Sequence, residues 1–352
     1  MKIAYLLEDT ELAGGIRVAV AHGDALTDRG HEVTLVTKGG PLTWRSSRAQ
    51  WRYVRSFEEL DARAFDFVVG TFWTTLAIAH SLAGDRAVHF CQGYEGGFTA
   101  YQPQRPLIDE AYRLPLPKIT VSPHLVPVCR AFYNDATYVG QIVDDAFFQP
   151  HAPHDGKPRV LLVGPAQADF KGIDVGYDAV RHARALGADF ELIRATQWPA
   201  AEDEPAELAA EFHVALPTQE MAQLFASCDV FLGPSRSEEG FGLPAAEAMA
   251  SGVPSVLSEI PSFLSWDNAH DYAAFAADGN GVALGERLAS LLADPTLAGQ
   301  LARRGRMVVE QFRAGRTAQR LEQWFEERLR AQRVIAKTQE RQMKSSGESS
   351  TP

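Results

Sequence analysis

The stretch DVFLGPSRSEEGFGLPAAEAMASGVPSVLS, residues 229–258, has the pattern of a strand, a loop, a helix and a second strand. The apolar runs at its two ends predict buried strands, and AAEAMA between them predicts a helix. Pro244 suits the first helical position, where its missing N–H leaves no partner unsatisfied. Two strands joined by a helix form a βαβ unit, which is the building block of a parallel sheet.

Similar apolar runs recur along the chain, and helical patterns separate most of them. The runs are nearly continuous in Val, Ile, Leu and Phe, which is typical of strands buried on both faces. Because they are too many for one open sheet of usual size, we expect an α/β protein with two Rossmann-like domains whose parallel sheets face each other across a cleft. The runs are 2–7, 32–37, 65–70, 87–91, 118–122, 159–164, 190–195, 229–235 and 254–258.

A cluster of Pro, His, Gly and Asp at residues 147–159 marks a domain boundary. We therefore predict an N-terminal domain at 1–150 and a C-terminal domain at 151–330, which ends in helices. A single apolar stripe indicates that the last helix packs against the protein as far as about residue 330: Leu321, Trp324, Phe325 and Leu329. The polar segment 331–352 is predicted to be disordered.

The composition excludes several classes of protein. Of 352 residues, 45% are hydrophobic and 22% charged, as in a soluble globular protein, and a net charge of −11 argues against sequence-independent binding of nucleic acid. Three scattered cysteines predict neither a disulfide framework nor a metal site, and the first residues lack the features of a signal peptide. The longest uncharged stretch, 67–84, changes from a strand pattern to a helix pattern, so we do not interpret it as a membrane span. We expect a cytoplasmic protein.

The loop between the strand and the helix of the opening stretch has the features of a ligand site. Gly240 and Gly242 allow the backbone to approach a ligand closely, and amides near the helix start favour an anion. Glu239 and Glu247 would repel a phosphate, so we interpret them as acceptors of hydrogen bonds from hydroxyl groups. A ligand with a phosphate in the middle and hydroxyls at both ends is a nucleotide-sugar. From these residues alone, a plain helix start with solvated acids is an equal alternative.

The segment EEGFGLPAAEAMASGVP, residues 238–254, resembles the signature of the retaining glycosyltransferases of family 4, which have the GT-B architecture. Glu239 and Glu247 match the two glutamates of that motif in spacing and context. Three further segments resemble the family's first βαβ unit, the approach to its interdomain linker and its Lys-Gly motif: 13–39, 140–150 and 169–174. The resemblance covers about residues 1–330.

The resemblance implies a role for each matching residue. Glu247 would bind the ribose, and Glu239 would hold the transferred sugar near its 3-hydroxyl and stabilise the positive charge of the transition state. Lys171 would pair with the diphosphate, whose charge grows as the glycosidic bond breaks. The other donor-binding positions are Gly14 and Gly15 from the N-terminal domain, which would be the acceptor side, and Phe241, Gly242 and Leu243. Base contacts are expected around residues 214–217.

No metal or other cofactor is implied, because the sequence has no Asp-x-Asp cluster in a suitable loop and its histidines lack ligand spacing. The lysine and the helix dipole would serve in place of a metal, and the nucleotide-sugar is a co-substrate.

The sequence departs from the family pattern at two positions. Pro165 stands where an arginine is usual, so one cation for the diphosphate is missing, and Arg17 or Arg236 could replace it. Gln92 stands where many relatives have a histidine; it can hydrogen-bond a sugar but cannot accept a proton. Glu95 is an alternative group for positioning the acceptor, unless it is a solvated loop acid.

We therefore expect a retaining, metal-independent glycosyltransferase that moves a hexose or deoxyhexose from a nucleotide-diphosphate sugar to a hydroxyl acceptor. Surface glycans, glycolipids or small molecules would be its products. The alternatives are a GT-B nucleotide-sugar epimerase and a non-catalytic nucleotide-sugar-binding homologue; a nicotinamide oxidoreductase fits poorly, since ELAGGIR lacks the Gly-x-Gly-x-x-Gly turn. Residues 41–55, with four arginines, two tryptophans and a tyrosine, are either a peripheral contact with the inner membrane face or a plain surface strand and loop.

Overall fold

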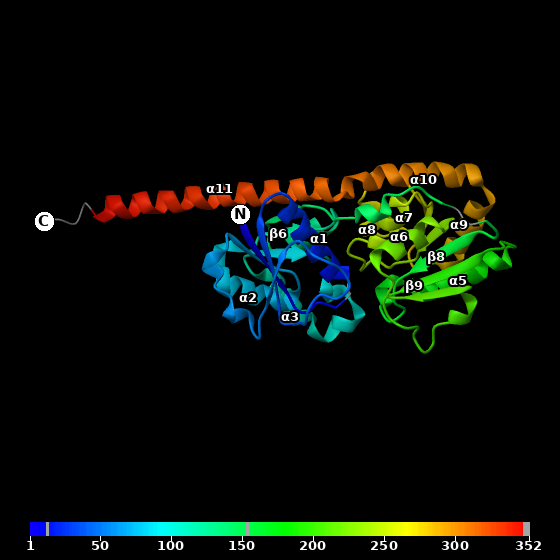
Figure 1. The fold of residues 1–352 in the computed structure, drawn as a ribbon, viewed down its shortest axis with the longest axis horizontal. Coiled ribbons are helices and arrows are strands. Elements are labelled where there is room, and N and C mark those ends of the chain that lie inside the picture. Colours follow the sequence, from blue (N-terminus) through cyan, green and yellow to red (C-terminus); the bar gives the residue numbers. More distant parts are fainter. Residues whose placement is uncertain (12–13, 153–154, 348–352) are drawn as a thin grey trace.

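A computed structural model describes residues 1–11, 14–152 and 155–347 of the chain. Two α/β halves lie side by side (Figure 1). The N-terminal half contains a seven-stranded sheet of order β3-β2-β1-β4-β5-β6-β7, in which every pairing is parallel. Its strands are β1 (Lys2–Leu7), β2 (Glu32–Thr37), β3 (Gln50–Tyr53), β4 (Phe67–Gly70), β5 (Ala87–Cys91), β6 (Lys118–Thr120) and β7 (Ala136–Tyr138), and its helices are α1 (Gly14–Asp28), α2 (Trp73–Ala83), α3 (Arg105–Arg113) and α4 (Leu125–Arg130).

The C-terminal half contains a six-stranded parallel sheet of order β10-β9-β8-β11-β12-β13. The predicted boundary at residue 150 falls in the connection between the two sheets. Its strands are β8 (Arg159–Val163), β9 (Glu191–Thr196), β10 (Glu211–Val214), β11 (Val230–Gly233), β12 (Ser255–Ser258) and β13 (Ala274–Ala276); its helices are α5 (Ile173–Ala185), α6 (Thr218–Ala226), α7 (Leu243–Ala250), α8 (Pro261–Leu264), α9 (Gly281–Ala293) and α10 (Pro295–Val309).

Each sheet has one point where the direction of its connections reverses. In the N-terminal sheet, β1 pairs with β2 on one side and β4 on the other, and in the C-terminal sheet β8 pairs with β9 and β11. Ligands of open α/β sheets bind beyond the carboxyl ends of the strands at such points. The loops that follow β1, β4 and β8 contribute residues to one cleft between the halves, which confirms the predicted two-sheet arrangement.

The last helix, α11 (Ala314–Gly347), leaves the C-terminal half and runs along the N-terminal half (Figure 1). It packs against α1, and the ring of Phe325 lies 5.0 Å from that of Phe67 on β4. The apolar stripe predicted for this helix therefore packs against the N-terminal half, although we had assigned the helix to the C-terminal domain from the sequence. The structure also continues the helix to Gly347, where the sequence predicted disorder from residue 331; residues 348–352 lie outside the described residues.

One acidic segment is less exposed than its sequence predicts. The run AAEDEPAELAAE, residues 200–211, has the composition of a solvated loop and helix face, but the Glu204 carboxylate pairs with Arg194 at 2.8 Å, and both side chains are buried. Arg194 also donates to the carbonyl of Gly164, at 2.7 Å, just after β8. This buried pair supports the loop that carries Pro165 into the cleft.

Candidate active site

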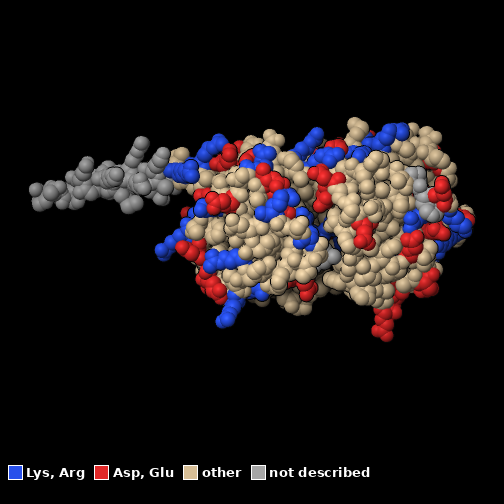
Figure 2. Space-filling model, viewed as in Figure 1, with Lys and Arg blue, Asp and Glu red and all other residues tan. Residues whose placement is uncertain are grey.

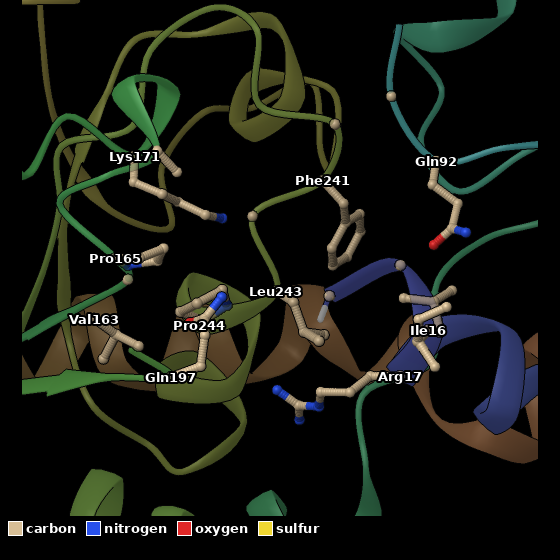
Figure 3. Close-up of a pocket in the computed structure, with 18 of the residues that line it drawn as sticks. Ile16, Arg17, Gln92, Val163, Pro165, Lys171, Gln197, Phe241, Leu243 and Pro244 are labelled. Carbon is tan, nitrogen blue, oxygen red and sulfur yellow. The ribbon is translucent and has the colours of Figure 1, made fainter. Parts of the chain in front are cut away.

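The cleft between the halves has a volume of about 560 Å³. Figure 3 shows residues from both halves facing it, with Ile16, Arg17 and Gln92 opposite Lys171 and Leu243. The structure brings together all but one of the predicted site residues, the exception being Arg236. Those that line the cleft are Gly14, Gly15, Arg17, Gln92, Glu95, Lys171, Glu239, Phe241, Gly242, Leu243 and Glu247.

Glu239 is a buried carboxylate just before α7. Its Oε2 accepts hydrogen bonds from Lys171 Nζ at 2.7 Å and from Ser235 Oγ at 3.1 Å, and its Oε1 accepts one from the Gly242 amide at 3.1 Å. The amide of Gly242, which we expected to be free for an anion, is therefore bound to Glu239. The helix begins at Leu243, one residue earlier than predicted.

Two glycines of the loop have separate structural requirements. Gly242 has φ = +85°, a left-handed conformation that side chains rarely adopt, and a Cβ there would lie 2.1 Å from the Phe263 ring. At Gly240 a Cβ would lie 1.9 Å from the carbonyl oxygen of Gln92, which belongs to the other half. The glycine that we expected to admit a ligand thus admits the backbone of the N-terminal half.

Phe241 anchors this loop. Its ring is buried and lies 5.1 Å from the ring of Trp266 and 4.9 Å from that of Phe312. It contributes to the wall of the cleft from within the hydrophobic core, so its contact with a donor would be by packing.

Glu247 pairs with a cation from the opposite half. Arg17, in the first turn of α1, donates from Nη2 to Glu247 Oε1 at 2.7 Å, and the side chains are 27% and 2% exposed. Burial raises the pKa of Glu247, and the Arg17 charge opposes that rise. Both glutamates of the motif therefore face a cation within the cleft.

Pro165, two residues after β8, also lines the cleft. Of its two candidate replacements, Arg17 lies in the cleft. Arg236 does not line it, because its guanidinium pairs with Asp174 at 2.6 Å and donates to the Asp169 carbonyl. In the segment predicted to contact a base, Ala215 and Leu216 reach the cleft.

Glu95 is buried at the cleft wall, and burial raises its pKa to about 7. The Tyr112 hydroxyl contacts both Glu95 Oε2 and, at 2.7 Å, the Gly93 carbonyl. A hydroxyl has one hydrogen to donate and a carbonyl oxygen only accepts, so both bonds form together when the Glu95 carboxyl carries the proton. Glu95 is therefore not the solvated loop acid of the alternative interpretation.

The two halves touch through the loops beside the site. The ring of Phe98 stacks on that of Phe170, with centroids 4.8 Å apart, and Phe170 precedes Lys171. This stacking and the contact of Gly240 with Gln92 connect the two sides of the cleft next to Lys171.

Sequence reasoning missed an aromatic surface on the N-terminal side of the cleft, which we call the aromatic wall: Phe72, Phe98 and Tyr101. The Tyr101 ring lies 5.9 Å from that of Phe72 and 6.3 Å from that of Phe98. Only the place of Phe72, just after a predicted strand, could have signalled it, since Phe98 and Tyr101 lie at and within a short 3₁₀ helix, Thr99–Gln104, whose sequence has no clear periodic pattern.

The arginines and tryptophans of residues 41–55 are partly engaged by the protein itself. Arg45 pairs with Asp24 at 2.8 Å, Arg48 pairs with Asp28 at 2.6 Å, and Trp44 Nε1 donates to the Thr10 carbonyl. Acidic and basic side chains are interspersed over the face shown in Figure 2. Within the described residues, no helix is long and apolar enough to cross a bilayer, and no group of three or more His, Cys, Asp or Glu side chains could hold a metal ion.

Comparison with known proteins agrees with this architecture. Residues 157–294 match the family described as "Glycosyl transferases group 1". The structure is similar to that of HepE from Anabaena in complex with UDP-glucose, with a TM-score of 0.76 and 15% identity over 93% of this chain and 100% of that one. It is also similar to sucrose-phosphate synthase from Thermosynechococcus elongatus, with a TM-score of 0.75 and 17% identity over 94% of this chain and 99% of that one. The fold is GT-B.

The matched family segment contains α7, Lys171 and both motif glutamates, and it forms most of the C-terminal half of the GT-B fold. Over 127 residues the chain is 38% identical to the "MMP alpha-(1->4)-mannosyltransferase" of Mycolicibacterium hassiacum, a match that spans 33% of this chain and 29% of that relative. The family segment and the GT-B neighbours together support a glycosyltransferase.

Proposed function

We propose that the chain is a retaining, metal-independent glycosyltransferase of family 4. It moves a hexose or deoxyhexose from a nucleotide-diphosphate sugar to a hydroxyl acceptor. The observation that carries the proposal is the pairing of Lys171 with Glu239 at 2.7 Å, at the start of α7 and inside a cleft that both halves line.

In the reaction, the bond between the sugar C1 and the diphosphate oxygen breaks, and a bond from C1 to the acceptor oxygen forms on the same face. The acceptor's proton passes to the departing diphosphate, so the products are a glycoside and a nucleoside diphosphate. Lys171 stabilises the charge that grows on the diphosphate, and Glu239 stabilises the positive sugar ring. Because the proton leaves with the diphosphate, Gln92 need not act as a base.

The ion pairs of the cleft fit these roles. Lys171 and Glu239 neutralise each other before the donor arrives, and the donor then separates them, with the lysine turning to the diphosphate and the glutamate to the sugar. Arg17 likewise separates from Glu247, which then binds the ribose. Arg17 itself turns to the diphosphate, in place of the arginine that is usual at the position of Pro165. This exchange of ionic partners requires that side chains of both halves reach the same donor. The close approach of Gly240 to the Gln92 carbonyl holds the two halves near each other.

The acceptor binds on the N-terminal side, where Glu95 and Gln92 line the cleft. The similarity to an alpha-(1->4)-mannosyltransferase favours a saccharide product, such as a surface glycan or glycolipid. The enzyme would work in the cytoplasm, and residues 41–55 would provide any contact with the inner membrane face.

A thermal-shift screen against nucleotide-sugars and nucleoside diphosphates, without added metal, tests the donor. A ligand at 100 times its dissociation constant should stabilise the protein by about 2.7 kcal/mol. The anomeric configuration of the product, read by NMR, then tests retention. Binding without transfer or hydrolysis would favour a non-catalytic homologue, an altered sugar without an acceptor would favour an epimerase, and no shift with any ligand would refute the proposal.

A further inference from the structure

The aromatic wall and the nearby acids indicate what kind of acceptor the cleft takes. The three rings of the aromatic wall are half-buried, and each lines the cleft. Through the stacking of Phe98 on Phe170, the wall extends to the residue before Lys171, where the departing diphosphate would lie. A molecule resting on the wall would therefore lie beside the reacting bond.

The three rings are inclined to one another, by 65° between Phe72 and Tyr101 and by 49° between Phe98 and Tyr101, so they offer separate apolar faces to a weakly polar ligand. The face of a ring carries partial negative charge, which attracts the slightly positive C–H groups of a sugar ring. A phosphate gains nothing from such a face. The wall thus favours the C–H face of a sugar over a charged group.

The charges around the wall are mainly acidic. Glu8 and Asp9 follow β1 and line the cleft, and Thr74, two residues from Phe72, donates to the Glu8 carboxylate. Glu95 lies on the same side, but burial raises its pKa to about 7, so it carries less negative charge than Glu8 and Asp9 do; the Trp73 amide at the start of α2 lowers that pKa in part. The amino end of α2, which could otherwise attract an anion, therefore already faces the Glu95 carboxyl.

The basic side chains on the N-terminal side of the cleft are already paired with carboxylates. Among the described cleft residues of the N-terminal half, Arg17 is the one basic side chain, and it is bonded to Glu247. Lys38 pairs with Glu8 at 2.8 Å but does not line the cleft. A phosphorylated acceptor would meet the Asp9 carboxylate here, while the nearby basic side chains Arg17 and Lys38 are already paired.

We propose that the acceptor is an unphosphorylated carbohydrate whose C–H groups pack against the aromatic wall and whose hydroxyls bond to Glu8 and Asp9. This inference rests on the proposed glycosyl transfer and names its acceptor class. It excludes a sugar phosphate or a lipid diphosphate whose phosphate lies next to the accepting hydroxyl.

The test compares the same sugars with and without a phosphate group. Transfer from the nucleotide-sugar with the largest thermal shift is measured to methyl glucoside, galactoside and mannoside, and to the 6-phosphates of the same sugars. We expect kcat/KM to be at least about 10-fold higher for a neutral glycoside. Preference for the phosphates, or use of no neutral glycoside while the donor is hydrolysed, would overturn the inference. If the protein neither bound nor hydrolysed any nucleotide-sugar, the proposed function itself would be refuted.

Two variants separate stacking from charge. Tyr101→Ala should raise the acceptor KM by about 10-fold or more, and this increase should exceed any change in acceptor-free donor hydrolysis. Asp9→Asn should narrow the gap between neutral and phosphorylated acceptors. Leu107→Ala, which removes exposed apolar surface outside the cleft on α3, is the matched control and should change neither value. Equal effects of Tyr101→Ala and Leu107→Ala on the acceptor KM would refute the stacking role.

Discussion

Replacing Lys171 with Met removes its charge while keeping most of its aliphatic stem. The stem matters because it packs near Gly164, where a Cβ would lie 3.2 Å from Lys171 Cγ. After the change, Glu239 would still accept hydrogen bonds from Ser235 and Gly242, at 3.1 Å each. We therefore expect a folded protein that loses roughly 1–3 kcal/mol of stability from the buried carboxylate's lost partner.

The effect on catalysis should be larger than the effect on binding. In the ligand-free cleft Lys171 is engaged by Glu239, so turning to the donor gains only the difference between two ionic contacts. In the transition state the charge on the diphosphate increases, and losing one such stabilising group costs roughly 100- to 1,000-fold in kcat. Donor affinity should fall much less.

Steady-state kinetics with the identified donor would give kcat, and calorimetry would give its affinity. Lys157→Met is the matched control, because Lys157 is exposed and pairs with Asp189 outside the cleft. An equal loss of kcat and donor affinity in Lys171→Met would refute the reasoning, since the lysine would then contribute only ground-state attraction. An unchanged kcat would refute it as well.

Glu247→Gln should weaken binding of the matching nucleoside diphosphate by about 10- to 150-fold, because a hydrogen bond to a charged group contributes about 1.5–3 kcal/mol. Calorimetry measures this, and unchanged affinity would contradict a ribose contact. Glu204→Ala leaves the Arg194 guanidinium buried without its partner and should lower the free energy of unfolding by about 3–5 kcal/mol in urea titrations; a loss below about 1 kcal/mol would show that the pair contributes little. Burial raises the pKa of Glu95 to about 7, so the folded state holds its proton more tightly than the unfolded state does. Stability from this group is present below the unfolded pKa and is lost as pH rises to 7, by about 1.4 kcal/mol per unit at most. Urea titrations from pH 5 to 7 should show this slope in the wild type relative to Glu95→Gln, and parallel curves would refute it.

The sequence predicted the strands at the centres of the sheets and missed those at the edges. Central strands are buried on both faces, so their apolar runs are continuous, as in KIAYLL of β1. The edge strands β7, β10 and β13 were not predicted, and β3 was only an alternative for residues 41–55. These strands span only three or four residues, and none of them is buried along its whole length, so their sequences show little apolar pattern.

In the site, a local motif gave the identities of the residues but not their partners. Glu239 and Glu247 lie within one short segment, whose spacing is visible in the sequence. Their cations come from Lys171 and Arg17, which are 68 and 230 residues away along the chain. Such pairings depend on how the two halves meet, as does the contact of Gly240 on Gln92, and no local spacing encodes that geometry.

The path of α11 means that the N-terminal half is not one continuous piece of chain. The N-terminal sheet needs Phe325 from the far end of the sequence, and Arg328 pairs with Asp135 beside β7. A chimaera that exchanged acceptor specificity by swapping residues 1–150 alone would join a foreign sheet to this helix and leave Phe325 without its fitted neighbour. Recombination within this fold should therefore move residues 1–150 and the α11 segment together, as a single two-part module.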